Sequence, residues 1–430
     1  MKPQSLKFFQ LKLIALFCLV SFTFGISPAN ATTNTAEEIG DWLQYLLPAA
    51  GFVGTYVADD PEGRKQWFKG VGGSVATTWT LKAIYGKMRP GNDSLTSFPS
   101  GHTTAAFAGA GFIDARYGHG WGSLAYAGAV FTGYSRVNAD KHFADDVLAG
   151  MSVALFNTWG WVTPQHESVS LMPMAVDSGM GLMINVTDPR YVKKEKEKKG
   201  HLPPKFKYAA SFGSVFLMRN LITAPASGGT TFNLADFDKR DDPMTSAEIS
   251  LEWFPADRHT LGLWLWPFES RDTKFLTSPI NFNGTTFASG TSIYSKFRHY
   301  KADLMYSYDL LPNSPWVIKP HVGASLQWTQ VTLGDAGRET KVDDYVILPL
   351  IGISAGYRFN DNWIAEAAVT GMSLSSDEYL SSHAEVRYKF NRKWEIGVGA
   401  GYYYRDIDTG ELKESAAHVP VYVNLSYTFY

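Results

Sequence analysis

The segments KAIYGKMRP at residues 82–90, SFPSGH at 97–102 and SRVNADKHFADD at 135–146 place three polar islands in a run of small, helix-compatible residues. Three cations recur in these islands without an obvious acidic partner beside them: Lys82, Arg89 and Arg136. Three such cations converging on one point would suit a phosphoryl group, whose negative charge is spread over three oxygens in the transition state. We therefore expect this stretch to build an oxyanion site within a helical domain.

Two further features of the islands predict covalent chemistry. His142 and Asp146 are four residues apart, so they share one face of a helix, where the carboxylate can accept from one imidazole nitrogen. The other nitrogen is then free to act as a nucleophile. Ser100 and Gly101 precede a helix expected to begin near His102, and their backbone N–H groups could bind an anion there.

Taken together, Lys82-x6-Arg89-Pro90, Pro99-Ser100-Gly101-His102 and Ser135-Arg136-x5-His142-x3-Asp146 resemble the signature of the type 2 phosphatidic acid phosphatase (PAP2) superfamily. The resemblance covers roughly residues 37–164. It implies that His142 attacks phosphorus to form a phosphohistidine and that Asp146 orients it. It also implies that His102 protonates the leaving oxygen and then activates water.

The same resemblance implies a set of phosphate-binding residues and no metal or other cofactor, because the cations would supply the charge that Mg²⁺ supplies elsewhere. These residues are Lys82, Arg89, Ser100, Gly101 and Arg136. Four charged residues near the islands do not match the pattern and are interpreted as helix-surface or rim residues: Lys87, Asp140, Lys141 and Asp145.

The start of the chain predicts export. Lysines at positions 2, 7 and 12, an apolar stretch at 13–24 and Ala29-Asn30-Ala31 are typical of a secretory signal peptide over residues 1–31. The single cysteine, Cys18, lies within it, so the mature chain would have neither a disulfide nor a thiol nucleophile. With 39 basic and 41 acidic residues, the charge balance gives no reason to expect nucleic-acid binding.

Residues 32–166 are expected to form an all-α bundle. The predicted helices are Glu37–Val57, Pro61–Tyr85, Thr103–Tyr117, Gly120–Arg136 and Phe143–Trp161. None is an unbroken run of about twenty apolar residues. This favours a compact soluble domain, which could also rest on a membrane surface. Three aromatic residues are candidates for the border of the site: Trp67, Phe98 and Trp121. Aromatic residues in such places more often belong to the hydrophobic core.

Residues 167–204 are predicted to connect two domains. Ser168–Val186 is compatible with a short β-hairpin around Asp177-Ser178-Gly179. The mixed charge run at 193–200 is interpreted as a solvated linker, with contact to anionic lipid headgroups as the alternative.

From residue 205 to 430 the apolar period becomes two. Segments of about ten residues, such as Tyr300–Tyr308 and Trp394–Tyr404, alternate with short turns and long polar loops, and the chain ends on aromatic residues. The expected long loops include residues 334–344 and 405–417. This pattern predicts an antiparallel outer-membrane β-barrel of about ten strands, with eight or twelve as alternatives and a soluble β-sandwich as the competing fold. Twelve strands would result if Ser168–Val186 joined the sheet.

Inward positions of the expected barrel carry charges of both signs, and we expect them to pair and fill the lumen. They are Glu248, Glu252, Lys301, Asp303, Lys319, Glu366, Glu385, Arg387 and Glu395. Ser381, His383 and Glu385 are successive inward residues of one strand and cannot form a triad, so they are interpreted as structural.

Together these features predict a metal-independent phosphatase at the periplasmic face of the outer membrane of a Gram-negative bacterium. The expected substrate is a phosphate or pyrophosphate group of a lipid related to phosphatidic acid, phosphatidylglycerol phosphate, isoprenyl pyrophosphate or lipid A. The main alternative is a broad-specificity periplasmic acid phosphatase for small phosphomonoesters, tethered by the barrel. A channel or adhesin with an inactive helical domain, a vanadate-dependent haloperoxidase and a phosphotransferase are further alternatives. The sequence leaves open whether the barrel conducts.

Overall fold

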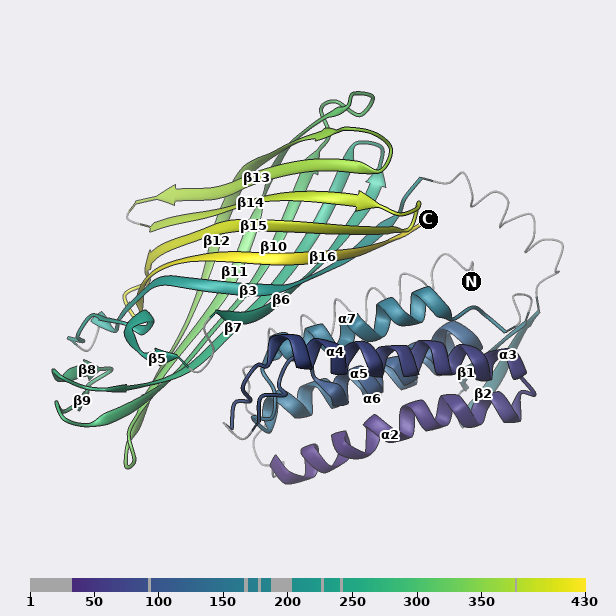
Figure 1. Cartoon of the computed structure of the whole chain (residues 1–430), viewed down its shortest axis with the longest axis horizontal. Coiled ribbons are helices and arrows are strands. Elements are labelled where there is room, and N and C mark those ends of the chain that lie inside the picture. Colours follow the sequence, from purple (N-terminus) through teal and green to yellow (C-terminus); the bar gives the residue numbers. More distant parts are fainter. Residues whose placement is uncertain are drawn as a thin grey trace. The chain divides into compact units, whose positions relative to one another are not determined.

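A computed structural model describes residues 33–91, 94–165, 169–176, 179–186, 203–225, 228–239, 243–375 and 377–430 (Figure 1). The chain divides into two compact units between Pro203 and Pro204, and each is described separately. The expected signal peptide and the charge run at 193–200 lie outside the described residues.

The first unit is a bundle of helices around α5. Its elements are α2 (Thr33–Val57), α3 (Pro61–Trp67), the π-helical turn η1 (Phe68–Gly72), α4 (Gly73–Tyr85), α5 (Gly101–Tyr117), α6 (His119–Asn138) and α7 (Ala144–Trp161). Small buried residues such as Ala106, Ala108 and Ala110 let α2, α6 and α7 pack closely on α5. The all-α prediction is confirmed, except that the helix expected over Pro61–Tyr85 is interrupted at the glycine-rich sequence FKGVG.

Local sequence fixes where these helices begin and end. Asp60 caps α3, because its side chain accepts from the backbone N–H of Gly63 at 2.8 Å, and Pro61 occupies the first turn. Gly86 ends α4 with a φ of +57°, a conformation that glycine adopts without strain. The chain then enters the segment 87–100, which carries part of the site. Among the described helices, none combines the length and apolarity needed to cross a membrane.

The predicted hairpin forms outside the larger sheet. β1 (Val169–Val176) and β2 (Gly179–Val186) pair antiparallel as a separate two-stranded sheet. The twelve-strand alternative for the barrel is therefore wrong.

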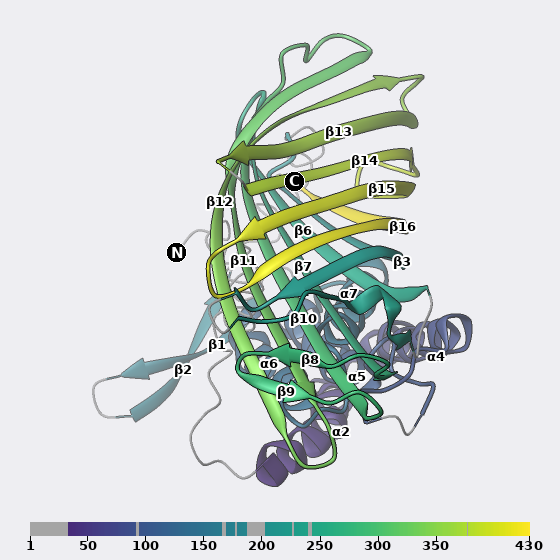
Figure 2. The ribbon, with the colours of Figure 1, turned by 90° about the vertical axis from the view of Figure 1, so that its left-hand side faces the viewer.

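The second unit is a closed antiparallel β-barrel of ten strands, as predicted (Figures 1 and 2). The strands are β3 (Phe206–Thr223), β6 (Met244–Ala256), β7 (His259–Phe275), β10 (Ser292–Tyr308), β11 (Trp316–Gly334), β12 (Glu339–Arg358), β13 (Trp363–Leu374), β14 (Asp377–Lys389), β15 (Trp394–Asp408) and β16 (Lys413–Phe429). Pairing of β16 with β3 and of β7 with β10 closes the ring. The short elements β4 (Phe232–Asn233), η3 (Leu234–Asp236), β5 (Asp238–Lys239), β8 (Ile280–Phe282) and β9 (Thr285–Phe287) belong to the long loops.

The outer wall of the barrel is apolar where the chain would meet lipid. Along β12, the exposed residues Ile347, Ile351 and Ile353 alternate with inward residues, of which Leu348 and Ser354 are buried. At the ends that carry the short turns, tryptophans pack on tyrosines of the neighbouring strand, as interfacial girdles do. These pairs are Trp316–Tyr357, Trp363–Tyr388 and Trp394–Tyr427.

The strands are longer than the sequence predicted, with 12 to 20 residues instead of about ten. The expected long loops at 334–344 and 405–417 are mostly paired strand, so β11 and β12 are joined by residues 335–338 alone and β15 and β16 by 409–412. Outward residues of these extensions, such as Glu339, Lys341 and Asp343, are polar. The apolar alternation therefore marks only the lipid-facing part of each strand.

Several of the charges expected in the lumen form ion pairs. Arg387 lies 2.6 Å from Glu366, and Lys301 lies 2.8 Å from Asp303. Glu395 is 2.7 Å from Lys207 on β3, a partner that the sequence did not suggest.

Side chains from opposite walls meet across the barrel. β10 and β15 are five strands apart in either direction around the ring, yet Tyr403 Oη on β15 lies 3.2 Å from Nε2 of His299 on β10. Arg405 on β15 hydrogen-bonds to Thr329 on β11 at 2.9 Å and forms an ion pair with Glu414 on β16. This polar layer fills the middle of the lumen.

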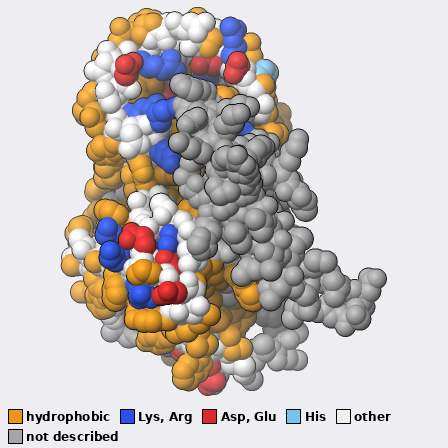
Figure 3. All heavy atoms as spheres, turned by 90° about the vertical axis from the view of Figure 1, so that its right-hand side faces the viewer, with side chains coloured by type: hydrophobic (Ala, Val, Ile, Leu, Met, Phe, Trp, Pro, Cys, Tyr) orange, Lys and Arg blue, Asp and Glu red, His pale blue; other side chains and the backbone are white. Residues whose placement is uncertain are grey.

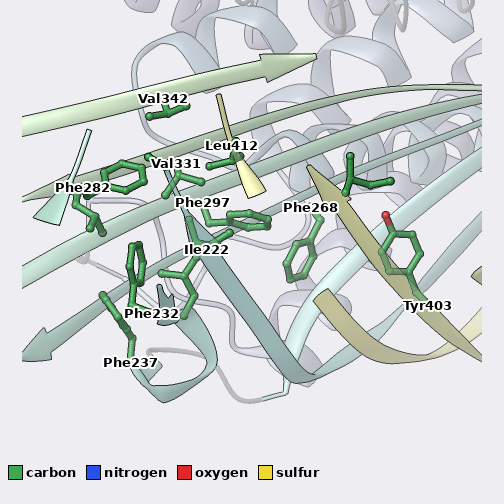
Figure 4. Packing of buried hydrophobic residues seen from close by; sticks show 14 of the residues in the cluster. Ile222, Phe232, Phe237, Phe268, Phe282, Phe297, Val331, Val342, Tyr403 and Leu412 are labelled. Carbon is green, nitrogen blue, oxygen red and sulfur yellow. The ribbon is translucent and has the colours of Figure 1, made fainter. Parts of the chain in front are cut away.

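A buried apolar cluster fills the lumen and loops on the long-loop side (Figure 4). Strands contribute Phe297, Val331 and Ile407, and the hairpin of β8 and β9 contributes Phe282 and Phe287. The polar layer and the apolar cluster together leave the barrel packed along much of its length.

Because of this packing, we expect the detergent-folded full chain to show no stepwise conductance in planar lipid bilayers. The Tyr403→Ala/Arg405→Ala/Glu414→Ala variant, which removes the side chains spanning the lumen without leaving one buried charge unpaired, is expected to admit ions. Regular open-channel steps from the unmodified chain would contradict a sealed barrel.

Candidate active site

All eight residues singled out in the three islands lie at one end of the helical unit. Lys82 is in the last turn of α4, Ser100 caps α5, Arg136 is in the last turn of α6, and Asp146 is in the first turn of α7. The backbone N–H of Ser100 donates to the carbonyl of Asp146 at 2.9 Å, which joins α5 to α7. Packing of antiparallel helices thus assembles the islands.

His142 and Asp146 face each other, as their spacing predicts. Nδ1 of His142 lies 3.5 Å from Oδ2 of Asp146, which is longer than an ordinary hydrogen bond. Catalytic hydrogen bonds are often this long before a substrate binds. The same Oδ2 accepts from the backbone N–H of Phe143 at 2.9 Å and from Oγ of Ser97 at 2.5 Å. These donors fix the carboxylate at the start of α7 and point it at the imidazole.

The surroundings set the charge of this pair. Burial lowers the pKa of His142, and the adjacent carboxylate of Asp146 only partly offsets this, so the imidazole is held neutral. Burial alone would raise the pKa of Asp146, but the charge of Lys87 and the contact with His142 hold it well below its usual range. The geometry therefore combines a neutral histidine with an ionised carboxylate.

The interpretation of Lys87 and Asp145 as surface residues is wrong. Lys87 has a side chain only 4% exposed, and its Nζ lies 2.7 Å from Oδ2 of Asp145 and 3.0 Å from Oδ1 of Asp146. Burial lowers the pKa of Lys87, but the two carboxylates raise it by more, so the cation persists. The ion pair could not be predicted from spacing along the chain, because Lys87 and Asp145 are 58 residues apart.

Lys82 has a structural contact that the sequence did not predict. Its Nζ donates to the backbone carbonyls of Thr96 and, at 2.6 Å, Pro99, which shapes the segment before α5. Burial lowers its pKa to about 8. Gly101 lies beside it, and a Cβ at Gly101 would meet only Cε of Lys82, at 3.9 Å. The backbone of Gly101 is therefore open on the side that faces the lysine.

The anion-binding donors differ in how free they are. The backbone N–H of Ser100 donates to the carbonyl of Asp146, so of the two helix-start donors expected to bind an anion only the N–H of Gly101 stays a candidate. Nε of Arg89 is buried and has no hydrogen-bond partner among the described residues. An orphan buried cationic donor favours an anionic ligand.

Arg136 is anchored by the start of α2. Its guanidinium donates to Oδ1 of Asp41 at 2.7 Å and to the backbone carbonyl of Glu37 at 2.7 Å. Gly40 makes this approach possible, since a Cβ there would lie 2.1 Å from Oγ of Ser135. Sequence reasoning missed Asp41, because α2 lies outside the three islands.

Asp41 also contacts His102, with Oδ1 3.0 Å from Nε2. Burial and the charge of Arg136 lower the pKa of His102 to about 4, while Asp41 opposes the shift. The side chains of His102 and Asp41 are 26% and 45% exposed, so the site opens between the start of α2 and the start of α5. Of the candidate border residues, Phe98 is fully buried, and Trp67 and Trp121 lie on elements at the opposite end of the bundle.

The described residues contain no group of three or more histidine, cysteine, aspartate or glutamate side chains placed to hold a metal ion.

Two sequence comparisons match the helical unit. The family model "PAP2 superfamily" matches residues 68–169. Lipid A 4'-phosphatase of Helicobacter pylori is 32% identical over 152 residues, which cover 31% of this chain and 71% of the relative.

The chain belongs to the PAP2 superfamily.

Lipid A 1-phosphatase of Porphyromonas gingivalis is 43% identical over 77 residues, which cover 17% of this PAP2 chain and 17% of the relative. The outer membrane protease OmpT from Escherichia coli is a solved structure with 12% identity and a TM-score of 0.35, and its alignment covers 53% of this chain and 97% of that one.

The buried lysine of this PAP2 chain yields a prediction. Lys87→Met should lower the free energy of unfolding of the helical unit by about 3–5 kcal/mol, because it leaves two adjacent buried carboxylates without a cation. This free energy is measured by unfolding the detergent-folded full chain in urea, with proteolysis of the helical unit as the readout. The matched change Lys141→Met removes an exposed lysine 3.2 Å from Glu37 and should cost under about 1 kcal/mol. Equal effects of the two changes would contradict the structural role of Lys87.

Proposed function

We propose that the helical unit is a phosphatase that removes phosphate from a lipid through a phosphohistidine on His142. The observation that carries this proposal is the neutral, buried His142 held against an ionised Asp146 at the end of the bundle where Arg89 and Arg136 gather. Membership of the PAP2 superfamily supports it.

In the first step, Nε2 of His142 attacks phosphorus and the bond from phosphorus to the leaving oxygen breaks. His102 gives its proton to that oxygen, with Asp41 accepting from its Nε2 and Nδ1 serving the leaving group. The pKa of His102 is about 4 in the free site, and the negative charge of a bound phosphate would raise it, so the proton arrives with the substrate. In the second step, water loses a proton to His102 and attacks the phosphohistidine, releasing inorganic phosphate and neutral His142.

A lipid substrate is supported by two observations. The two matched relatives are named as phosphatases of lipid A, although the chain spans only 17% of one and 71% of the other. The barrel has an apolar outer wall of the outer-membrane type, which brings the site to a lipid surface.

We propose that the site faces the periplasm. The two ends of the barrel sequence, Phe206 and Phe429, pair with each other, and the long connections from β3 to β6 and from β7 to β10 lie at the opposite end of the barrel. In outer-membrane barrels the longer loops are extracellular, so the helical unit that precedes β3 belongs on the periplasmic side.

The open mouth beside His102 and Asp41 favours a second candidate, a broad-specificity acid phosphatase for soluble phosphomonoesters. Only residues 91–98 separate the first two islands, which leaves little chain for a lid.

The decisive experiment is phosphate release by the detergent-folded full chain, without added metal, from a panel of lipid phosphates and one soluble phosphomonoester. We expect release from lipids, reduced about 10⁴-fold or more in His142→Ala. His119→Ala, at the opposite end of the bundle, should keep its activity. Release from the soluble ester alone would favour the second candidate, and no release from either by folded protein would overturn both.

A pH prediction follows from the contact of Asp41 with His102. Asp41 raises the pKa of His102, so Asp41→Asn should lower it, and the alkaline limb of kcat/KM should move to lower pH because the acid form is lost earlier. The acid limb, set by His142, should stay. Glu38→Gln, an exposed neighbour on α2, is the control and should leave both limbs in place. An unchanged alkaline limb in Asp41→Asn would contradict the assignment of the general acid.

A further inference from the structure

Outward side chains of β10, β11 and β12 change character in rows as the three strands approach the long-loop end of the barrel. Residues directly opposite each other on neighbouring strands share one face of the sheet. Two rows in the lipid-facing part are apolar, and their larger side chains are exposed: Leu304, Ala324 and Pro349 in one, and Ala302, Leu326 and Ile347 in the next. The following row is aromatic and consists of Tyr300, Trp328 and Tyr345. An aromatic row that follows apolar rows marks the edge of the hydrocarbon layer.

The first row beyond this aromatic edge holds an arginine in a fixed position. Arg298 on β10 is opposite Glu269 on β7 and Gln330 on β11, and its guanidinium donates to them at 3.1 Å and 3.2 Å. The hydroxyl of Tyr300 donates to the other carboxylate oxygen of Glu269. The guanidinium is therefore held one same-face step, about 7 Å along the strand, beyond the aromatic row.

The second row beyond the aromatic edge brings cations together. Lys296 on β10 is directly opposite Arg271 on β7, and on its other side Thr332 separates it from Lys341 on β12. We call Arg271, Lys296 and Lys341 the basic row. Like charges directly opposite each other destabilise an antiparallel sheet. The arrangement therefore costs stability unless an anion lies against it.

Carboxylates lie beside the basic row but do not occupy all of its donors. Glu339 lies 3.5 Å from Nζ of Lys296, and Asp343 lies 3.1 Å from Nζ of Lys341. Each of these carboxylates also accepts a hydrogen bond from a neutral side chain. An ammonium group has three donors, so one carboxylate contact leaves donors for a further oxygen. Together, the two rows beyond the aromatic edge and their neighbours hold four cations and three carboxylates: Arg271, Lys296, Arg298 and Lys341 beside Glu269, Glu339 and Asp343.

Other parts of the described barrel distribute their charges differently. On β14 and β15, the outward positions next to Leu380 and Tyr404 are acidic, namely Glu378 and Asp406. At the short-turn end, lysine and arginine side chains lie among aspartate and glutamate side chains, as the upper part of Figure 3 shows. A general excess of cations on the barrel therefore does not explain the basic row.

The width of the basic row indicates the kind of anion that it fits. Arg271 and Lys341 are three strand spacings apart, about 14 Å, which is wider than a single phosphate group. Lysine and arginine bind phosphate oxygens through charge-assisted hydrogen bonds. An anion at this height above the apolar rows can also place acyl chains on them. These features fit a lipid with more than one phosphate in its headgroup.

We propose that the outward face of β7, β10, β11 and β12 binds a lipid whose headgroup carries two phosphates. The phosphates lie on the basic row and on Arg298, and the acyl chains lie on the apolar rows. In the proposed orientation of the barrel, this lipid belongs to the outer leaflet. The binding site itself does not depend on the proposed phosphatase function.

Binding is tested on the detergent-folded full chain in a His142→Ala background, so that no phosphate is removed from the probe. Native mass spectrometry counts the lipids retained per chain, with diphosphorylated lipid A and cardiolipin as two-phosphate probes, and monophosphorylated lipid A and phosphatidylglycerol as one-phosphate probes. Arg271→Gln/Lys296→Gln removes the facing cations. The matched control Arg219→Gln/Lys413→Gln removes the same two residue types from β3 and β16, on another side of the ring.

We expect the control to retain one more two-phosphate lipid per chain than Arg271→Gln/Lys296→Gln, which should bind that lipid at least tenfold more weakly. The one-phosphate lipids should show no such difference. Stronger retention of lipid A identifies the ligand as a glycolipid, and stronger retention of cardiolipin identifies it as a phospholipid. Equal retention by the two variants, or the same difference with one-phosphate lipids, would overturn the proposal. Both variants have the same catalytic residues, so the comparison stands even if the proposed phosphatase function fails.

Thermal unfolding in detergent supplies a second test. Without lipid, Arg271→Gln/Lys296→Gln should unfold at the same temperature as the unmodified chain or at a higher one, because two facing like charges are removed. The two-phosphate lipid that is retained should raise the unfolding temperature of the unmodified chain by several degrees and leave that of the variant unchanged. A lower unfolding temperature of the lipid-free variant would overturn the proposal, since the basic row would then stabilise the barrel without a ligand.

Discussion

A buried ion cluster of one lysine and two carboxylates holds the site together. Lys87, Asp145 and Asp146 are almost fully buried, and their contacts join the segment after α4 to the start of α7. A lone ionised carboxylate at this depth would be expensive, so the lysine makes the ionised Asp146 possible. Asp146 in turn orients His142 and accepts from Ser97, and its carbonyl accepts from Ser100.

Both units must pair their backbone N–H and C=O groups in hydrogen bonds, and they do so in different ways. The closed sheet of the barrel pairs the backbone groups of every strand with those of its two neighbours. Its apolar side chains point outward, and paired charges and aromatic rings fill its interior. The helical unit pairs its backbone groups within each helix.

Sequence reasoning succeeded where the signal is local or is carried by several residues together. Helix starts followed from residues such as Pro61, which suits a first turn, the barrel from period-two alternation, and the His142–Asp146 contact from a spacing of four. It failed where burial decides the role of a residue. Lys87 and Asp145 read as surface charges because no local pattern distinguishes a solvated lysine from one paired in the interior. Strand lengths were underestimated, because outward residues become polar once a strand leaves the lipid.

The sequence by itself determined the fold class of each unit and the residues that gather at the site, since period, capping and motif spacing are properties of neighbouring residues. The tertiary structure alone decided that Asp41 of α2 reaches His102 and Arg136, that Lys87 supports Asp146, and that His299 and Tyr403 meet across the barrel. These contacts join residues up to 104 positions apart. Such pairs form because packing and desolvation bring distant side chains together, and no local pattern encodes that meeting.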